Sequence, residues 1–178
     1  HYSIPPILHY SYVEARINTM FGFYGRVLAV DLTDQSFEIE TLDGEICEQV
    51  LGGKGLGTHL LLRKNPRGVD PLLPENRLIF ATGPVCQSGL WGSSRYGVFT
   101  KSPQTGFYSE SYSGGRVPEA IDAAGFDAIV IRGKARKPTA LSVHPEGCEF
   151  FDASDLWGAE TYRAEDEARK RFSIEKPG

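Results

Sequence analysis

The sequence predicts an α+β fold of hairpin-rich β-sheets with a few helices. Apolar and polar residues alternate in short runs that come in neighbouring pairs with turn residues between them, as in β-hairpins. Helical segments are few and separate blocks of strands, which favours α+β over a doubly wound parallel sheet. With 178 residues, 40% of them hydrophobic and 24% charged, the chain is long enough for one core or two small lobes.

The first half of the chain is expected to contain three strands and two helices. Alternation predicts strands at residues 25–33 and 36–42, joined by a short turn. Residues 44–65 are expected to form two short helices that are broken at a run of glycines. Residues 77–85 follow a proline-rich connection and have the apolar character of a buried strand that ends in a Gly-Pro turn.

The second half begins with a predicted hairpin at residues 93–115, with its turn at 102–106. Residues 117–125 predict a helix, because proline stands in its first turn and glycine at its end. The remaining predicted elements are strands at 126–135 and within 139–153, followed by a charged helix within 159–172.

Charge is distributed unevenly along the chain. The whole sequence has a formal net charge of −4, yet residues 93–137 carry seven Lys or Arg and four acids. An acidic chain argues against a general nucleic-acid binder, which is usually basic over a whole face. A basic, glycine-rich centre suggests a small anionic ligand instead.

The predicted hairpin, SSRYGVFTKSPQTGFYSESYSGG, is unusually rich in Gly and Ser, which contribute little to a packed sheet surface. Arg95 opens its first strand, and Gly114 and Gly115 follow its second. An arginine beside glycine-exposed amides is a combination that holds phosphate. The alternative is a flat, hydroxyl-rich face that packs on another domain. Glu110 is the least ordinary carboxylate of the chain because it lies within this hairpin.

A second glycine-rich run, GGKGLG at residues 52–57, has two interpretations. It matches neither standard phosphate-loop pattern, and it follows a predicted helix where such loops follow a strand. We expect it to separate two helices, although a helix N-terminus at this point could still face an anion.

Other residue types give few candidates for chemistry. Cys47, Cys86 and Cys148 are far apart, without a CxxC motif or Cys/His cluster, and are expected to be buried free thiols in a reducing cytoplasm. The histidines are weak candidates, and no carboxylate is expected in an apolar setting that would tune its pKa for acid–base work. No run approaches the ~18 apolar residues of a membrane span. Residue by residue, the chain therefore predicts an anion-holding domain without catalytic machinery or a metal site of its own.

Several segments together resemble a known family. They are, in order along the chain, YGRVLAVDLT, LGGKGLGTHLLL, VDPLLPENRLIFATGP, SRYGVFTKSPQTGFYSESYSGG, AGFDAIVIRGKA and DASDLWG. They closely resemble the N-terminal domain of the tungsten-containing aldehyde:ferredoxin oxidoreductases. The resemblance runs from Met20 almost to the end of the chain. We therefore expect this domain over residues 20–178, truncated relative to the family, and an extension outside the fold at residues 1–19.

The resemblance implies an activity and its cofactors. Members of this family oxidise aldehydes to carboxylic acids and pass the electrons to ferredoxin in the cytoplasm. Two pterin cofactors hold their tungsten, or sometimes molybdenum, and the N-terminal domain, often described as two related halves, is the base for this bis-pterin. The [4Fe-4S] cluster, a magnesium ion and the catalytic residues depend on downstream domains of the same polypeptide, so this chain alone is expected to be inactive. A homodimer is possible.

The family's cofactor contacts carry over to four positions. The resemblance implies that Arg95 contacts a pterin phosphate, that Gly114 presents its backbone to the cofactor, and that Gly115 is a weaker companion. Tyr112 stands where well-known members have an Asn that helps to organise magnesium, which calls side-chain coordination into question, while a backbone contact could survive. The change could mark a subfamily such as the aromatic acyl-CoA reductase subunits. A free-standing, non-catalytic binding or interaction module is a further alternative.

Overall fold

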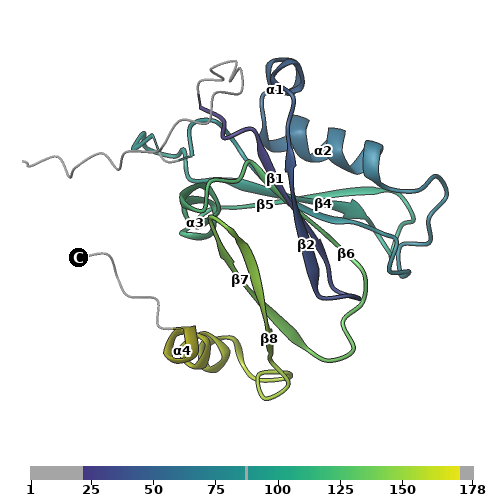
Figure 1. The fold of residues 1–178 in the computed structure, drawn as a ribbon, viewed down its shortest axis with the longest axis vertical. Helices are drawn as coiled ribbons and strands as arrows, with labels where there is room; N and C mark the ends of the chain where they lie inside the picture. Colours follow the sequence, from purple (N-terminus) through teal and green to yellow (C-terminus); the bar gives the residue numbers. More distant parts are fainter. Residues whose placement is uncertain (1–21, 87, 173–178) are drawn as a thin grey trace, which may run out of the picture.

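A six-stranded mixed sheet forms the centre of the structure, a computed structural model that describes residues 22–86 and 88–172 (Figure 1). The expected extension at residues 1–19 lies outside these ranges. The strand order is β2-β1-β6-β3-β4-β5; β1 and β6 are parallel, and all other neighbours are antiparallel. The strands are β1 (Arg26–Asp31), β2 (Ser36–Thr41), β3 (Leu78–Thr82), β4 (Tyr96–Lys101), β5 (Tyr108–Ser113) and β6 (Ala128–Arg132).

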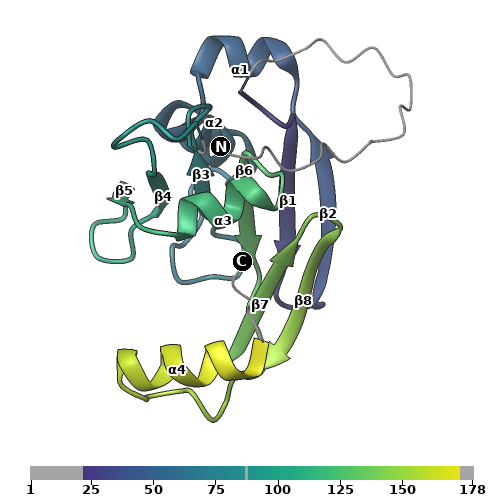
Figure 2. The same cartoon turned by 90° about the vertical axis from the view of Figure 1, so that its left-hand side faces the viewer.

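A separate hairpin and the helices complete the described part of the chain. The hairpin pairs β7 (Thr139–His144) with β8 (Gly147–Asp152). The helices are α1 (Gly44–Val50), α2 (Gly53–Lys64), α3 (Val117–Ala123) and α4 (Thr161–Phe172). Both views show α1 and α4 at opposite ends of the molecule, with the β7–β8 hairpin reaching towards α4 (Figures 1 and 2). The predicted α+β fold is confirmed, and each predicted strand and helix is present within a few residues of its expected place.

The two faces of the large sheet are buried in two separate apolar clusters. Side chains alternate between the faces of a strand, so Val27 and Leu28 of β1 belong to different clusters. The first cluster joins the sheet to α1 and α2, and Phe99 of β4 and Leu56 of α2 are fully buried in it. The second joins the other face to α3 and the β7–β8 hairpin. Cys47, Cys86 and Cys148 are buried free thiols, as predicted.

The GGKGLG run separates α1 from α2, as expected. Leu51 and Gly52, which lie between the two helices, have φ angles of 60° and 79°, so a right-handed helix cannot continue through them. A Cβ added to Gly57 would lie 2.1 Å from the ring of Phe99, and one added to Gly55 would lie 2.0 Å from the carbonyl oxygen of Val50. These glycines therefore let α2 approach both the sheet and α1.

Two carboxylates are buried, so the prediction that none lies in an apolar setting is wrong. Asp127 accepts hydrogen bonds from the backbone N–H groups of Tyr24 (3.1 Å) and Arg26 (3.0 Å), and burial raises its pKa. Asp122 accepts the hydroxyl of Tyr24 at 3.2 Å, and burial raises its pKa as well. Both aspartates fasten the beginning of β1 to α3 and β6, which is a structural role.

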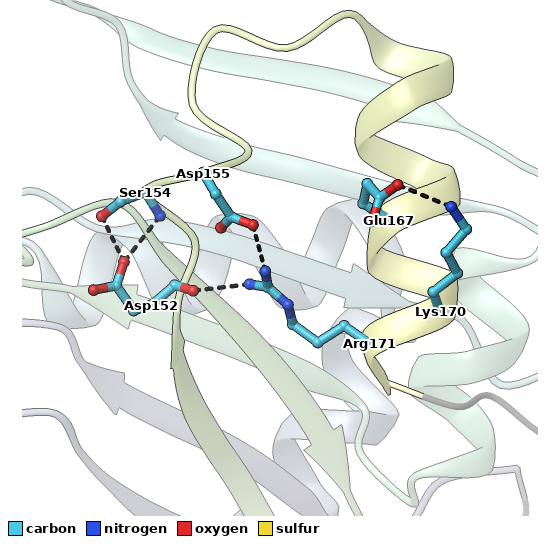
Figure 3. Close-up of polar contacts among 6 residues, drawn as sticks. All are labelled: Asp152, Ser154, Asp155, Glu167, Lys170 and Arg171. Atoms are coloured by element: carbon cyan, nitrogen blue, oxygen red, sulfur yellow. Dashed lines mark hydrogen bonds and ion pairs between the residues drawn. The ribbon is translucent and has the colours of Figure 1, made fainter.

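Helix α4 is anchored by polar contacts near its end (Figure 3). Arg171 donates to the carbonyl oxygen of Asp152 at 3.0 Å and forms an ion pair with Asp155. The hydroxyl and the backbone N–H of Ser154 both donate to the carboxylate of Asp152, which lowers the pKa of Asp152 to about 2. Within the described ranges, no helix is long and apolar enough to cross a membrane.

Candidate functional site

The open end of the β4–β5 hairpin brings three of the four predicted site residues together. Arg95 precedes β4 and Gly114 follows β5, and the register pairs Tyr96 with Ser113. The hydroxyl of Ser94 donates to the carbonyl oxygen of Gly115 at 2.5 Å, a link that the sequence analysis missed. We call Ser94, Arg95, Gly114 and Gly115 the hairpin end.

Gly114 and Gly115 differ in why they suit this place. A Cβ added to Gly114 would lie 3.0 Å from the carbonyl oxygen of Ser94 and 3.8 Å from Cδ of Arg95, so a larger residue would press on the neighbouring backbone. Gly115 has a φ of +80°, with no described atom within 4 Å of an added Cβ. The backbone is therefore exposed at Gly115 and half-buried against Ser94 at Gly114, and neither position carries a side chain.

Arg95 supplies the positive charge of the hairpin end. Its side chain is exposed, and no carboxylate within residues 22–86 and 88–172 forms an ion pair with it. The neighbouring Tyr96 is held in the β4–β5 register opposite Ser113, and the guanidinium of Arg95 is available to an anion as a forked donor.

A shallow concavity of about 440 Å³ borders the hairpin end. Gly89 and Gly92 have φ angles of 74° and 82°, with open space at their Cβ positions among the described residues. Trp91, next to them in sequence, is fully exposed. The residues that line the concavity are Cys86, Gly89, Leu90, Gly92, Ser93, Ser94 and Glu119. Because Glu119 is acidic, an anion is favoured at the Arg95 side of this surface.

Tyr112 directs its side chain away from the hairpin end. Its hydroxyl donates to Oε2 of Glu110 at 3.0 Å, and its ring meets Phe99 edge-on with 6.0 Å between the ring centroids. These contacts place the side chain on the sheet face that α2 covers. The backbone of Tyr112, and not its side chain, leads towards Gly114.

Glu110 gathers further polar groups on the same face. It accepts hydrogen bonds from Nζ of Lys54 (2.7 Å) and from the hydroxyl of Tyr108 (2.8 Å), in addition to Tyr112. These contacts lower the pKa of Glu110, with the Lys54 hydrogen bond as the largest cause. The sequence singled out Glu110 by its position, but it gave no signal for Lys54. Within the described residues, no group of three or more His, Cys, Asp or Glu side chains is placed to hold a metal ion.

The family profile described as "Aldehyde ferredoxin oxidoreductase, N-terminal domain" matches residues 27–177. The chain belongs to the aldehyde ferredoxin oxidoreductase family. It is 45% identical over 139 residues to the tungsten-containing aldehyde ferredoxin oxidoreductase of Pyrococcus abyssi, covering 78% of this chain and 23% of that protein. It is 41% identical over 157 residues to the Pyrococcus furiosus protein of the same name, covering 88% and 26%. The family resemblance seen in the sequence is thereby confirmed.

A solved structure agrees with this family at the level of the fold. The active-site complex BamBC of benzoyl coenzyme A reductase, determined with 1,5-dienoyl-CoA, superposes with a TM-score of 0.83 at 35% identity, over 88% of this chain and 24% of that chain. The aldehyde ferredoxin oxidoreductase family chain described here thus spans about a quarter of the length of the relatives that it matches.

Proposed function

We propose that this domain holds the phosphate end of a bis-pterin tungsten or molybdenum cofactor in a cytoplasmic oxidoreductase that converts aldehydes to carboxylic acids and passes electrons to ferredoxin. The observation that supports the proposal most directly is the hairpin end, where the exposed Arg95 has no ion-pair partner among the described residues and adjoins Gly114 and the exposed backbone of Gly115. The tungsten, the aldehyde and the ferredoxin in this proposal come from the names of the two Pyrococcus relatives reported above.

The residues of the hairpin end fit the phosphate part of such a cofactor. Arg95 would neutralise phosphate charge through its planar, forked guanidinium. Gly114 and Gly115 would let phosphate oxygens approach the backbone, because neither residue carries a side chain. When bound, the metal-pterin group supplies the two-electron oxidation of the aldehyde, and this domain positions it. Tyr112 would contact the cofactor through its backbone only. Gly115 would contribute the turn, with its φ of +80°, that leaves its own backbone exposed.

The direct test uses the chain itself with magnesium pyrophosphate as a probe for the phosphate groups. Amide resonances of the hairpin end should shift on titration, and Arg95→Ala should bind about tenfold or more weakly, the effect of one lost charge-assisted hydrogen bond. Arg63→Ala is the matched control, since Arg63 is also exposed and lies in the last turn of α2. Equal affinity of the two variants would contradict a role for Arg95.

A second test uses an enzyme that contains this domain. Arg95→Ala should lower its content of tungsten or molybdenum and of pterin phosphate relative to Arg63→Ala, measured on the purified protein. Unchanged metal content in both variants would contradict the proposal that the hairpin end retains the cofactor.

An aromatic acyl-CoA reductase subunit is the second candidate. The similarity to the benzoyl coenzyme A reductase complex favours it, at 35% identity against 41–45% for the aldehyde oxidoreductases named above. Because these identities are higher, we rank aldehyde oxidation above aromatic acyl-CoA reduction as the proposed activity. Assays of the enzyme with an aldehyde and with an aromatic acyl-CoA thioester distinguish the two, and activity with neither would favour the non-catalytic binding module.

A further inference from the structure

A polar network joins α2 to β5 beside the candidate cofactor site. Glu110 lies at its centre and uses both carboxylate oxygens: Oε1 accepts from Lys54, and Oε2 accepts from the hydroxyls of Tyr108 and Tyr112. The hydroxyl of Tyr108 also lies 2.8 Å from the hydroxyl of Thr58 on α2. We call Lys54, Thr58, Tyr108, Glu110 and Tyr112 the β5 network.

The β5 network acts on an edge strand. β5 pairs only with β4 in the described structure, so along its other edge no neighbouring strand holds the backbone. Its outward-facing serines supply no packing on the opposite face, since Ser111 and Ser113 are exposed. Besides the pairing with β4, contacts on the α2 face therefore hold the end of β5.

Tyr112 transmits this hold towards the hairpin end. Its ring packs edge-on against Phe99, and a Cβ on Gly97, its partner in β4, would lie 3.1 Å from Cε1 of Tyr112. The ring thus fills the space above a glycine, and its hydroxyl is fixed by Glu110. Gly114 lies two residues further along the chain, where no side chain can hold the backbone.

We propose that Glu110 is a positioning residue that fixes Tyr112 and, through it, the backbone of residues 112–115 in the arrangement that receives a phosphate group. The ligand in this inference rests on the proposed function. The statement that Glu110 holds the backbone of residues 112–115 concerns only the unliganded chain. Glu110 touches neither Arg95 nor Gly114 in any described contact, so it acts through Tyr112. Consistent with a hydroxyl held in this way, burial and the hydrogen bond to Glu110 raise the pKa of Tyr112.

The first experiment measures the unliganded chain by NMR. Backbone order parameters of residues 112–115 should fall in Glu110→Gln, which replaces a charged acceptor by a single neutral amide oxygen, and in Tyr112→Phe, which removes the donor. The double variant should show no further fall, because both changes act on the same hydrogen bond. Glu149→Gln on β8 is the control, because it makes the same substitution at a strand glutamate outside the β5 network. Unchanged order parameters at residues 112–115 in Glu110→Gln would overturn the proposal whatever the ligand is.

The second experiment measures how tightly the chain binds the probe magnesium pyrophosphate. Magnesium pyrophosphate should bind about fivefold more weakly to Glu110→Gln than to the unchanged chain, the effect of one lost hydrogen bond, while Glu149→Gln binds as the unchanged chain does. If Arg95→Ala weakens binding but Glu110→Gln does not, the positioning role fails and the proposed function stands. If Arg95→Ala has no effect while residues 112–115 loosen in Glu110→Gln, the proposed function fails and the positioning of this backbone stands.

Discussion

The two glycine-rich segments of this chain use the same residue for opposite purposes. In the 52–57 segment, Gly57 is buried and an added Cβ would lie 2.1 Å from the ring of Phe99. At the hairpin end, Gly115 has a φ of +80° and no described atom within 4 Å of an added Cβ. The first segment lacks side chains so that α2 can touch the sheet, and the second lacks them so that the backbone stays accessible.

This difference shows that a count of glycines does not identify a ligand site. Composition makes the two segments look alike, and the first even has the lysine that a phosphate loop would need. In the structure that residue, Lys54, is paired with Glu110, whereas Arg95 has no carboxylate partner in the described ranges. The state of the neighbouring charge and the space at Cβ distinguish the packing glycine Gly57 from the open turn glycine Gly115.

The largest effect is expected from Gly57→Ala. Phe99 is confined on two sides, because a Cβ on Gly97 would also lie 2.4 Å from its ring, so the ring cannot move away from an added methyl group. We expect the free energy of unfolding to fall by about 3 kcal/mol, the upper range of overpacking in a core. Urea unfolding of the variant measures this change.

A double variant tests the cause of that loss. Phe99→Leu removes the ring, so the methyl group of Gly57→Ala should cost less in the Phe99→Leu background than in the unchanged chain. Additive losses in the two variants would mean that the contact between Gly57 and Phe99 is not what limits the approach of α2, and the contrast between the two segments would weaken.

An intermediate effect is expected from Gly115→Ala. The left-handed conformation makes alanine unfavourable by about 1 kcal/mol, without a steric clash in the described structure. Gly68→Ala is the matched control, since Gly68 has a φ of +72° and similarly open space. Both variants should lose similar stability in urea, but only Gly115→Ala should weaken binding of magnesium pyrophosphate. Equal binding by both would place Gly115 among purely structural turn glycines.

Local patterns sufficed to predict most of the fold, because hairpin strands and short helices are encoded by neighbouring residues. The turn between β1 and β2 and the break between α1 and α2 are of this kind. The buried Asp127 was missed because the N–H groups that it accepts belong to Tyr24 and Arg26, about a hundred residues earlier. Long-range partners of this kind leave no periodic signal.

The candidate site was predicted in the same uneven way. The family resemblance named Arg95 and Gly114, and the hairpin register brings them together. The direction of the Tyr112 side chain could not be predicted, because either face of an edge strand accepts a tyrosine and only the position of α2 decides between them. Ser94 was missed because a serine in a serine-rich segment carries no distinguishing signal.

The smallest effect on stability is expected from the ion pair between Lys54 of the 52–57 segment and Glu110 of β5. The hydrogen bonds from Lys54 and the two tyrosines hold the pKa of Glu110 below its ordinary value of 4.5. The stability that the ionised carboxylate contributes is therefore present above pH 4.5 and is lost as the pH falls through the lowered pKa of the folded chain. Because both side chains are partly exposed, solvent and salt screen the pair.

Lys54→Met removes the charge of the ion pair but keeps most of the aliphatic side chain, so it isolates the contribution of the ion pair to stability. The urea midpoint of the variant should be slightly below that of the unchanged chain at neutral pH, and the two should converge only below the lowered pKa of Glu110, where the carboxylate of the folded chain is protonated. Added salt should reduce the difference at neutral pH as well. A difference in urea midpoint that persists in acid and in salt would mean that Lys54 stabilises the contact between α2 and β5 by packing and not by charge. The contact between α2 and β5 would then resemble the close packing of Gly57 on Phe99.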